Sequence, residues 1–229
     1  MVAVCIYLHR GVAHKSLEFH PWVAHAFRFW LWLTDGVHVK EWVATHRKHH
    51  RFTDVEGDPH SPLLIGIWAI VGRGFVQTCI YRYRSFAPKL EVEAYGAGTP
   101  DDWLERNFYV PHQRLGLLLL LIIDVLLFER LGLAIWLVQI IWTPLLSGSI
   151  ITGFAHYVGG YKTSKDNSRN YPFLGLLIIG DNLHSNHHAD PANPKLSRAW
   201  YEFDLGWLYI KALERLKLVK IIARPITNR

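Results

Sequence analysis

Apolar and polar positions along the chain predict a pair of long hydrophobic helices. The longest apolar stretch, residues 115–153, is interrupted by the adjacent charges Glu129 and Arg130, which divide it into segments 115–128 and 131–151. Spanning a bilayer takes about 20 residues of α-helix. The second segment has this length, whereas the first is short unless it begins about five residues earlier. The pattern therefore predicts a helical hairpin with its turn at the two charges.

Asp124 lies within the first of these segments. An ionisable group at membrane depth is costly, so we expect its side chain to face the interior of a helix bundle or a partner group. The alternative is that both segments are core helices of a soluble protein.

Two further segments are apolar without reaching the length of a membrane span. Residues 22–45 mix aromatic residues with charges such as Arg28 and Lys40, a pattern typical of an amphipathic helix in a membrane interface. The tryptophans of this segment are of a type enriched at such interfaces, namely Trp22, Trp30, Trp32 and Trp42. Residues 2–8 are too few for a signal peptide or a membrane helix, and we interpret them as the end of a longer helix.

Positive charge is distributed unevenly around the predicted hairpin. Residues 40–112 contain nine Lys and Arg and residues 157–229 contain eleven, whereas the hairpin turn contains only Arg130. Because Lys and Arg accumulate in cytosolic loops, we expect both regions to lie on the cytosolic side of a membrane. The net charge of +6 is thereby explained without nucleic acid, since no basic run with interleaved aromatics is present.

Composition restricts the kind of site that the chain can build. Charged residues make up 19% of the chain, below the roughly 25% of soluble domains. The two cysteines, Cys5 and Cys79, lie in unrelated contexts, which excludes a disulfide framework and a thiolate metal cage. Any metal site must therefore use nitrogen or oxygen ligands.

The candidate chemistry lies in the histidines, nine of which fall into four groups. The groups are the pair His9 and His14, the box His46-Arg47-Lys48-His49-His50, the single His156, and the box His184-Ser185-Asn186-His187-His188. In a helix, positions i, i+3 and i+4 project from one face, so each H-x-x-H-H box is predicted to supply three imidazoles as half of a site. His9 and His14 would lie about 140° apart on a regular helix, so they either serve different metals or depend on unwinding at Gly11.

Nine imidazoles exceed the roughly four to six ligands of a single metal ion and suit two. Nitrogen ligands suit iron, copper, nickel or zinc, but structural zinc needs only four ligands and usually recruits cysteine. The sequence therefore predicts a dinuclear site and favours a redox metal. The other histidines are expected to be ordinary surface or hydrogen-bonded residues: His20, His25, His38, His60 and His112.

Carboxylates close to the boxes in sequence are candidates to orient the imidazoles. They are Glu41, Asp54, Asp58, Asp181 and Asp190, and the sequence does not rank them. The alternative for each is a surface or turn residue, since Asp58-Pro59 and Asp190-Pro191 are turn signals.

The set of H-x4-H, two H-x-x-H-H boxes and one further His after the hairpin resembles the membrane fatty acid desaturase family. The likeness extends over nearly the whole chain and is greatest to the acyl-CoA delta-9 desaturases of the stearoyl-CoA type, in their bacterial form. It is carried by four motifs: Tyr7-Leu8-His9-Arg10, Glu41-Trp42-Val43-Ala44-Thr45-His46-Arg47-Lys48-His49-His50, Asp58-Pro59-His60-Ser61-Pro62 and Trp200-Tyr201-Glu202-Phe203-Asp204-Leu205-Gly206-Trp207.

The resemblance implies an all-α integral membrane helical bundle under a cytosolic helical cap that holds two irons beside a bent acyl tunnel. It implies that Trp42 lines the bend of this tunnel, with an interfacial tryptophan as the alternative. The iron ligands that it implies are His9, His14, His46, His49, His50, His156, His184, His187 and His188.

Three features depart from the family pattern. The family usually has a membrane hairpin before the first box, of which about eight residues remain here, so we expect residues 1–229 to form one domain that lacks most of that hairpin. Thr152 stands where the family commonly has an Asn that holds a metal-bound water. Ala44 and Thr45 stand where the animal enzymes have an Arg and an Asp that touch the coenzyme A headgroup.

On this basis we expect an O2-dependent desaturase that introduces a cis double bond into a fatty acyl chain, with acyl-CoA as the first candidate substrate. Two Fe2+ ions would be the cofactor, and a separate protein such as cytochrome b5 or ferredoxin the electron donor. The expected location is a bacterial inner membrane or an ER-type membrane. A histidine-box hydroxylase of alkanes, sterols or carotenoids would have the same ligands. A membrane protein that binds or transports metal without redox chemistry is the alternative from another class.

Overall fold

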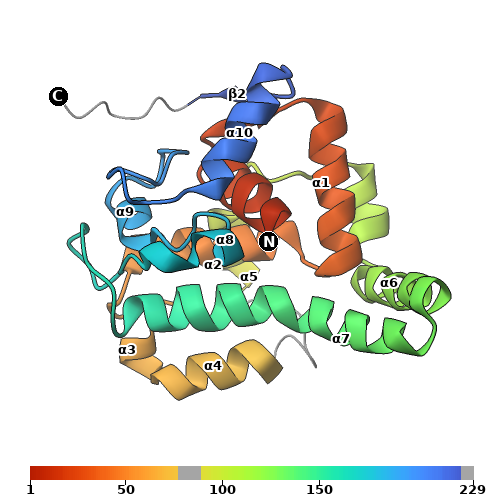
Figure 1. The fold of residues 1–229 in the computed structure, drawn as a ribbon, viewed down its shortest axis with the longest axis horizontal. Coiled ribbons are helices and arrows are strands. Elements are labelled where there is room, and N and C mark those ends of the chain that lie inside the picture. Colours follow the sequence, from red (N-terminus) through yellow and green to blue (C-terminus); the bar gives the residue numbers. More distant parts are fainter. Residues whose placement is uncertain (77–88, 223–229) are drawn as a thin grey trace.

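The computed structural model describes residues 1–76 and 89–222, which are mostly helical with almost no sheet (Figure 1). Cys79 lies outside the described residues. In chain order the elements are η1 (Ala3–Ala13), β1 (Leu17–Phe19), α1 (Pro21–Thr34), α2 (Val39–Phe52), α3 (Pro62–Ile65), α4 (Ile67–Val76), α5 (Lys89–Tyr95), η3 (Glu105–Tyr109), α6 (Gln113–Phe128), α7 (Arg130–Thr143), η4 (Pro144–Gly153), η5 (Phe154–His156), η6 (Pro172–Leu174), α8 (Gly175–Ile178), α9 (His184–Ala189), α10 (Leu205–Arg215) and β2 (Val219–Ile221).

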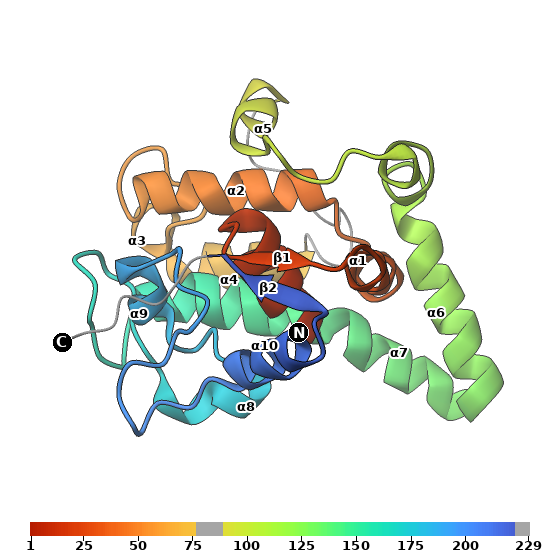
Figure 2. The same ribbon diagram turned by 90° about the horizontal axis from the view of Figure 1, so that it is seen from above.

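The predicted helical hairpin is present, as α6 followed by α7 with Glu129 between them in a left-handed backbone conformation (φ 49°). The two helices approach so closely that a side chain at Gly132 would meet the backbone oxygen of Asp124 at 2.2 Å. The side chain of Asp124 is itself buried, as expected for an ionisable group in an apolar helix. Figure 2 shows α6 and α7 meeting at an angle at one edge of the molecule, and α6 packs along α1.

Among the described residues, one continuous helical stretch is long and apolar enough to cross a membrane. It is Arg130–His156, of 27 residues, and comprises α7, η4 and η5. With 16 residues, α6 is shorter than a full span, in line with the sequence prediction for the first half of the hairpin.

The prediction of a single amphipathic helix over residues 22–45 was wrong. The segment forms α1 and α2, and the chain turns between them at Gly36, which has a left-handed φ of 57° that glycine adopts without strain. The tryptophans also differ in their surroundings: Trp22 and Trp30 are exposed, whereas Trp32 is buried against Phe108 and Tyr109. The segment therefore forms two helices with separate buried faces and does not present one continuous interfacial face.

The apolar run at the N-terminus forms a central element of the core. Helix η1 contacts α1, α2, α10 and β1, and its residues from Ala3 to Leu8 are at most 4% exposed. Its side chains Tyr7 and Leu8 share one hydrophobic cluster with Leu31 of α1 and Val43 of α2. Strands β1 and β2 pair antiparallel beside it, with Leu17 opposite Ile221 (Figure 2). The first histidine pair is thereby held on a buried helix.

Candidate metal centre

The nine histidines predicted as metal ligands converge in two adjacent clusters. The five-histidine cluster consists of His9, His14, His46, His50 and His187. The four-histidine cluster consists of His49, His156, His184 and His188. Within each cluster, one ring nitrogen of every member lies within 4.8 Å of those of the others. Segments up to 178 residues apart in the sequence thus meet at one place.

Each H-x-x-H-H box is divided between the two clusters, which corrects the prediction that a box forms half a site. On α2, His46 and His50 belong to the five-histidine cluster and His49 to the four-histidine cluster. On α9 the proportion is reversed: His187 belongs to the five-histidine cluster, and His184 and His188 belong to the four-histidine cluster. The three rings of a box do share a helix face, but that face lies across the boundary between the clusters. The boxes consequently hold the clusters together.

His9 and His14 lie in the same cluster because η1 is a π-helix. The His14 N–H donates to the His9 carbonyl at 3.1 Å, an i to i+5 hydrogen bond that places the two residues one above the other. Their ring centroids are 5.1 Å apart. Of the two alternatives, the geometry favours a changed helix, and the underwinding extends along all of Ala3–Ala13 instead of occurring at Gly11 alone.

Four of the imidazoles donate their Nδ1–H to a buried or partly buried carboxylate. His9 donates to Asp181 at 3.1 Å, His49 to Asp58 at 2.9 Å, His156 to Asp54 at 3.0 Å and His188 to Asp166 at 2.9 Å. The first three acids were among the sequence candidates. Two other candidates have different roles: Glu41 lies 3.1 Å from His38, and the backbone of Asp190 ends α9.

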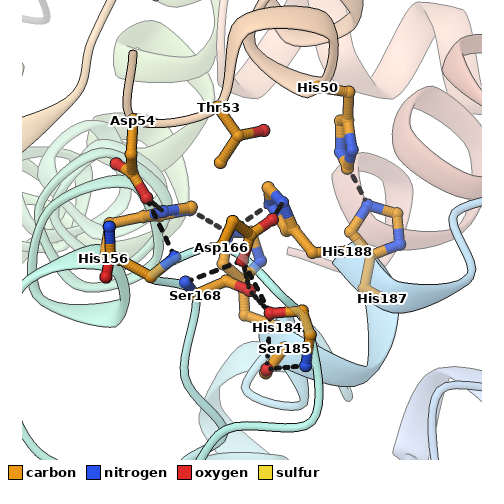
Figure 3. A network of polar contacts seen from close by, with 12 residues as sticks. His50, Thr53, Asp54, His156, Asp166, Ser168, His184, Ser185, His187 and His188 are labelled. Carbon is orange, nitrogen blue, oxygen red and sulfur yellow. Dashed lines mark hydrogen bonds and ion pairs between the residues drawn. The ribbon is translucent and has the colours of Figure 1, made fainter.

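Asp166 was missed by the sequence reasoning. It stands 22 residues before His188, in a segment of serines, lysines and glycines whose pattern predicts only a loop. Figure 3 shows its carboxylate beside His188, with His156 and His184 on the same side and the pair His50 and His187 on the other. No spacing rule connects it to the boxes, so only the fold reveals it.

The hydrogen bonds to carboxylates determine where the lone pairs of the imidazoles point. A carboxylate accepts only, so Nδ1 carries the proton in these four rings and Nε2 carries the lone pair. His184 Nε2 lies 2.8 Å from His156 Nε2 and 3.1 Å from His188 Nε2, and His187 Nε2 lies 3.0 Å from His9 Nε2. Converging lone pairs repel one another unless a cation lies among them, so the residues fit a metal centre.

Burial also favours the neutral form of most of these rings, which is the form in which an imidazole binds a metal. Burial, and then the neighbouring imidazoles, lower the pKa of seven of the rings well below the ordinary value of about 6.5. These are His14, His46, His49, His50, His184, His187 and His188. The supporting acids respond differently: although burial opposes it, His9 and Arg10 lower the pKa of Asp181, whereas burial raises the pKa of Asp58.

Of the histidines expected to be ordinary, one lies next to the clusters. The His60 ring centroid is 4.5 Å from that of His49, the backbone N–H of His60 donates to Asp58 at 3.0 Å, and burial lowers the pKa of the His60 side chain to about 3. The other four, His20, His25, His38 and His112, join neither cluster. His60 therefore belongs to the polar surroundings of the centre, which the Asp58-Pro59-His60 turn brings close.

Trp42 faces the five-histidine cluster. Its ring stacks on His46, four residues later on α2, with centroids 5.0 Å apart and planes 15° apart, and meets His9 edge-on at 6.2 Å. The side chain is half-buried. Thr152, by contrast, directs its hydroxyl to the Ser147 carbonyl at 3.1 Å, along its own helix.

The motif around Trp200–Trp207 supports the boxes from behind. Glu202 accepts from Asn186, the residue before His187, at 2.9 Å. Asp204 pairs at 3.0 Å with Arg10, which is fully buried and next to His9. These contacts explain why a motif without histidines accompanies the histidine boxes.

Comparison with known proteins gives a consistent result. The family model for fatty acid desaturases matches residues 1–221. The sn-1 stearoyl-lipid 9-desaturase of Synechocystis sp. is 28% identical over 98% of this chain and 68% of its own length. Delta-9 acyl-lipid desaturase 1 of Arabidopsis thaliana is 28% identical over 98% of this chain and 72% of its own length. An acyl-CoA 5-desaturase of Anemone leveillei is 29% identical over 95% of this chain and 66% of its own length.

Proposed function

The chain belongs to the fatty acid desaturase family, and from this premise we propose that it introduces a cis double bond into a fatty acyl chain in an O2-dependent reaction at a di-iron centre. The observation that carries the proposal is the convergence of nine imidazoles into two adjacent clusters of five and four. A single structural metal ion would need about four ligands. Two neighbouring clusters suit chemistry that needs two redox metals.

We assign the nine histidines as the ligands of two Fe2+ ions, with the five-histidine and four-histidine clusters holding one ion each. When bound, the irons would supply the reduction of O2 and the removal of one hydrogen from each of two adjacent methylenes, with electrons from a separate donor such as cytochrome b5 or ferredoxin. The chain itself supplies geometry: Asp54, Asp58, Asp166 and Asp181 fix the ring orientations, and helix packing fixes the helices.

We propose that the acyl chain passes along Trp42. Its indole stacks on the His46 ring of the five-histidine cluster and packs against the hydrophobic cluster that contains Leu8 and Val43. A flat apolar side chain against a ligand ring can fix which methylenes approach the metals, and positioning of this kind is the protein's main contribution to the reaction.

Two carriers for the acyl chain are compatible with the relatives. These relatives are named as stearoyl-lipid, acyl-lipid and acyl-CoA desaturases. At the two positions where animal enzymes touch coenzyme A, Ala44 is fully buried and the Thr45 hydroxyl donates to the Glu41 carbonyl at 2.9 Å. Neither side chain carries a charge for a coenzyme A headgroup. We propose acyl-CoA and acyl-lipid as the two candidate substrates, to be compared directly.

The family is associated with membranes, and the stretch Arg130–His156 is the part of the described chain suited to cross one. We propose that residues 1–229 act as one domain with the histidine centre on the cytosolic side. The uneven distribution of Lys and Arg supports this orientation, because both basic regions flank the hairpin.

The test is product analysis with iron-loaded protein in lipid bilayers. Labelled stearoyl-CoA and labelled stearoyl lipid are supplied in parallel with O2 and a reductase chain, and the products are identified by mass spectrometry. A mono-unsaturated product from either carrier supports the proposal and identifies the carrier. A hydroxylated product would instead assign the chain to the hydroxylases of alkanes, sterols or carotenoids. Metal binding without O2 consumption would favour a non-redox metal protein.

A further inference from the structure

The segment 162–170 forms a loop over the four-histidine cluster, contains one of the carboxylates that support it and contacts another. Asp166 accepts from His188 Nδ1, and the Asn167 N–H donates to Asp54 Oδ2 at 3.3 Å. Asp54 Oδ2 is the same oxygen that accepts from His156 Nδ1. The loop therefore contacts the hydrogen-bonding partners of two of the four rings, those of His156 and His188 (Figure 3).

The two oxygens of Asp166 have separate tasks. Its Oδ1 accepts from the Ser168 N–H at 2.9 Å, from the Ser164 hydroxyl at 2.6 Å and from the Ser168 hydroxyl. Its Oδ2 accepts from His188. Three donors on one side hold the carboxylate so that the other oxygen meets the imidazole in a fixed direction.

The loop is in turn fastened to the box that it supports. The Ser185 hydroxyl, adjacent to His184, accepts from the N–H groups of Thr163 at 2.8 Å and Ser164 at 2.9 Å. It also lies 2.9 Å from the Ser164 hydroxyl. Ser168 and Ser185 are completely buried, so these hydrogen bonds are protected from water. The serine of the box thus helps to place the carboxylate that orients the last histidine of the same box.

We propose that Asp166, held by Ser164 and Ser168, is a positioning residue that keeps His188 in the tautomer with its Nε2 lone pair directed into the four-histidine cluster, and that the metal affinity of this cluster depends on it. The inference rests on the proposed metal centre. It is specific to one cluster, because the contacts of the loop reach His188 and the acid beside His156 and no member of the five-histidine cluster.

The variant Asp166→Asn tests this with almost no change of shape. The amide oxygen must remain on the side of the Ser168 N–H, because a backbone N–H can only donate. The amide NH2 then faces His188 Nδ1, so this nitrogen must become the acceptor and the proton moves to Nε2. A protonated Nε2 is not a ligand. Asp190→Asn is the matched control, since it removes the same charge two residues after His188 from a side chain outside both clusters.

The experiment is titration of the chelated full chain in detergent with Co2+, followed by visible absorption. Two backgrounds separate the clusters: His14→Ala leaves the four-histidine cluster intact, and His184→Ala leaves the five-histidine cluster intact. In the first background, Asp166→Asn is expected to weaken Co2+ binding by roughly 10- to 100-fold, the usual effect of losing a supporting acid. In the second background it is expected to change nothing, and Asp190→Asn is expected to change nothing in either.

Ser168→Ala provides a second variant, expected to weaken the same step by less than about tenfold because two donors to Asp166 remain. Equal loss in both backgrounds, or unchanged affinity in the first, would overturn the role of Asp166 while the metal centre stands. Absence of Co2+ binding by the wild-type chain would overturn the metal centre itself, and this inference with it.

Discussion

The two histidine clusters share helices α2 and α9 but are supported in different ways. Three of the four rings in the four-histidine cluster donate to a carboxylate, namely His49, His156 and His188. Among the described residues, the five-histidine cluster has such a bond only at His9, whose acid Asp181 also lies 3.4 Å from the buried Arg10. Its other support is packing, with Trp42 stacked on His46. The number of imidazoles in a cluster therefore does not determine how many of them are oriented by a carboxylate.

Removal of a ligand should have the largest effect and should be selective for one cluster. We expect His187→Ala to lower activity by more than the roughly 10- to 100-fold that loss of a supporting acid costs, and to lower the iron content toward one ion per chain. His112→Ala is the control, because this histidine joins neither cluster and Trp32 bonds to its backbone carbonyl. Activity assays and elemental analysis would measure both. Equal losses in the two variants would show that the spacing of the boxes does not define the site.

Asp181→Asn should affect the five-histidine cluster and also the stability of the fold. It removes the partner of His9, with an expected loss of metal affinity of about 10- to 100-fold. It also removes one of two acids from Arg10, which remains paired with Asp204, so we expect a destabilisation of up to about 3 kcal/mol. Chemical denaturation of the metal-free chain would measure this. If Asp166→Asn destabilised the fold equally, the proposed difference in support between the clusters would be wrong.

The metal-free chain should lose stability as the pH falls. Seven cluster histidines have folded-state pKa values below the ordinary value of about 6.5, so below that pH the unfolded chain binds protons that the folded chain does not. The free energy of unfolding therefore carries no penalty from these histidines above pH 6.5. Below that pH it decreases, by an amount on the order of 1 kcal/mol per histidine for one pH unit. Thermal melts between pH 5 and 8 in chelator would show it. A melting temperature independent of pH would contradict the burial of neutral rings.

The smallest effect is expected at Trp42, which touches the five-histidine cluster without supplying a ligand. Trp42→Phe should keep both metals and change the preference between acyl chains of different length by about tenfold or less. Trp30→Phe, on the exposed side of α1, is the control. Product distributions from mixed acyl substrates would measure the preference. A loss of metal in Trp42→Phe would mean that the indole supports His46 and does not select the substrate.

The sequence predicted the nine clustered histidines and the hairpin because both depend on local spacing. The H-x-x-H-H boxes identify themselves by position, and the apolar stretch with its two charges locates the turn at Glu129. The pairing of His9 with His14 was left open between two alternatives because residue types do not reveal π-helical hydrogen bonding. Asp166 and Arg10 were missed because their partners are brought near by tertiary packing alone. The division of each box between the clusters likewise depends on how α2 meets α9.

The central claim is a dinuclear iron centre shared between the two clusters. It is tested most directly by elemental analysis of the purified full chain together with Mössbauer spectroscopy after growth on 57Fe. We expect two iron ions per chain in nitrogen-rich and inequivalent sites, with one of the two lost in His187→Ala. One zinc ion per chain and no iron would contradict it.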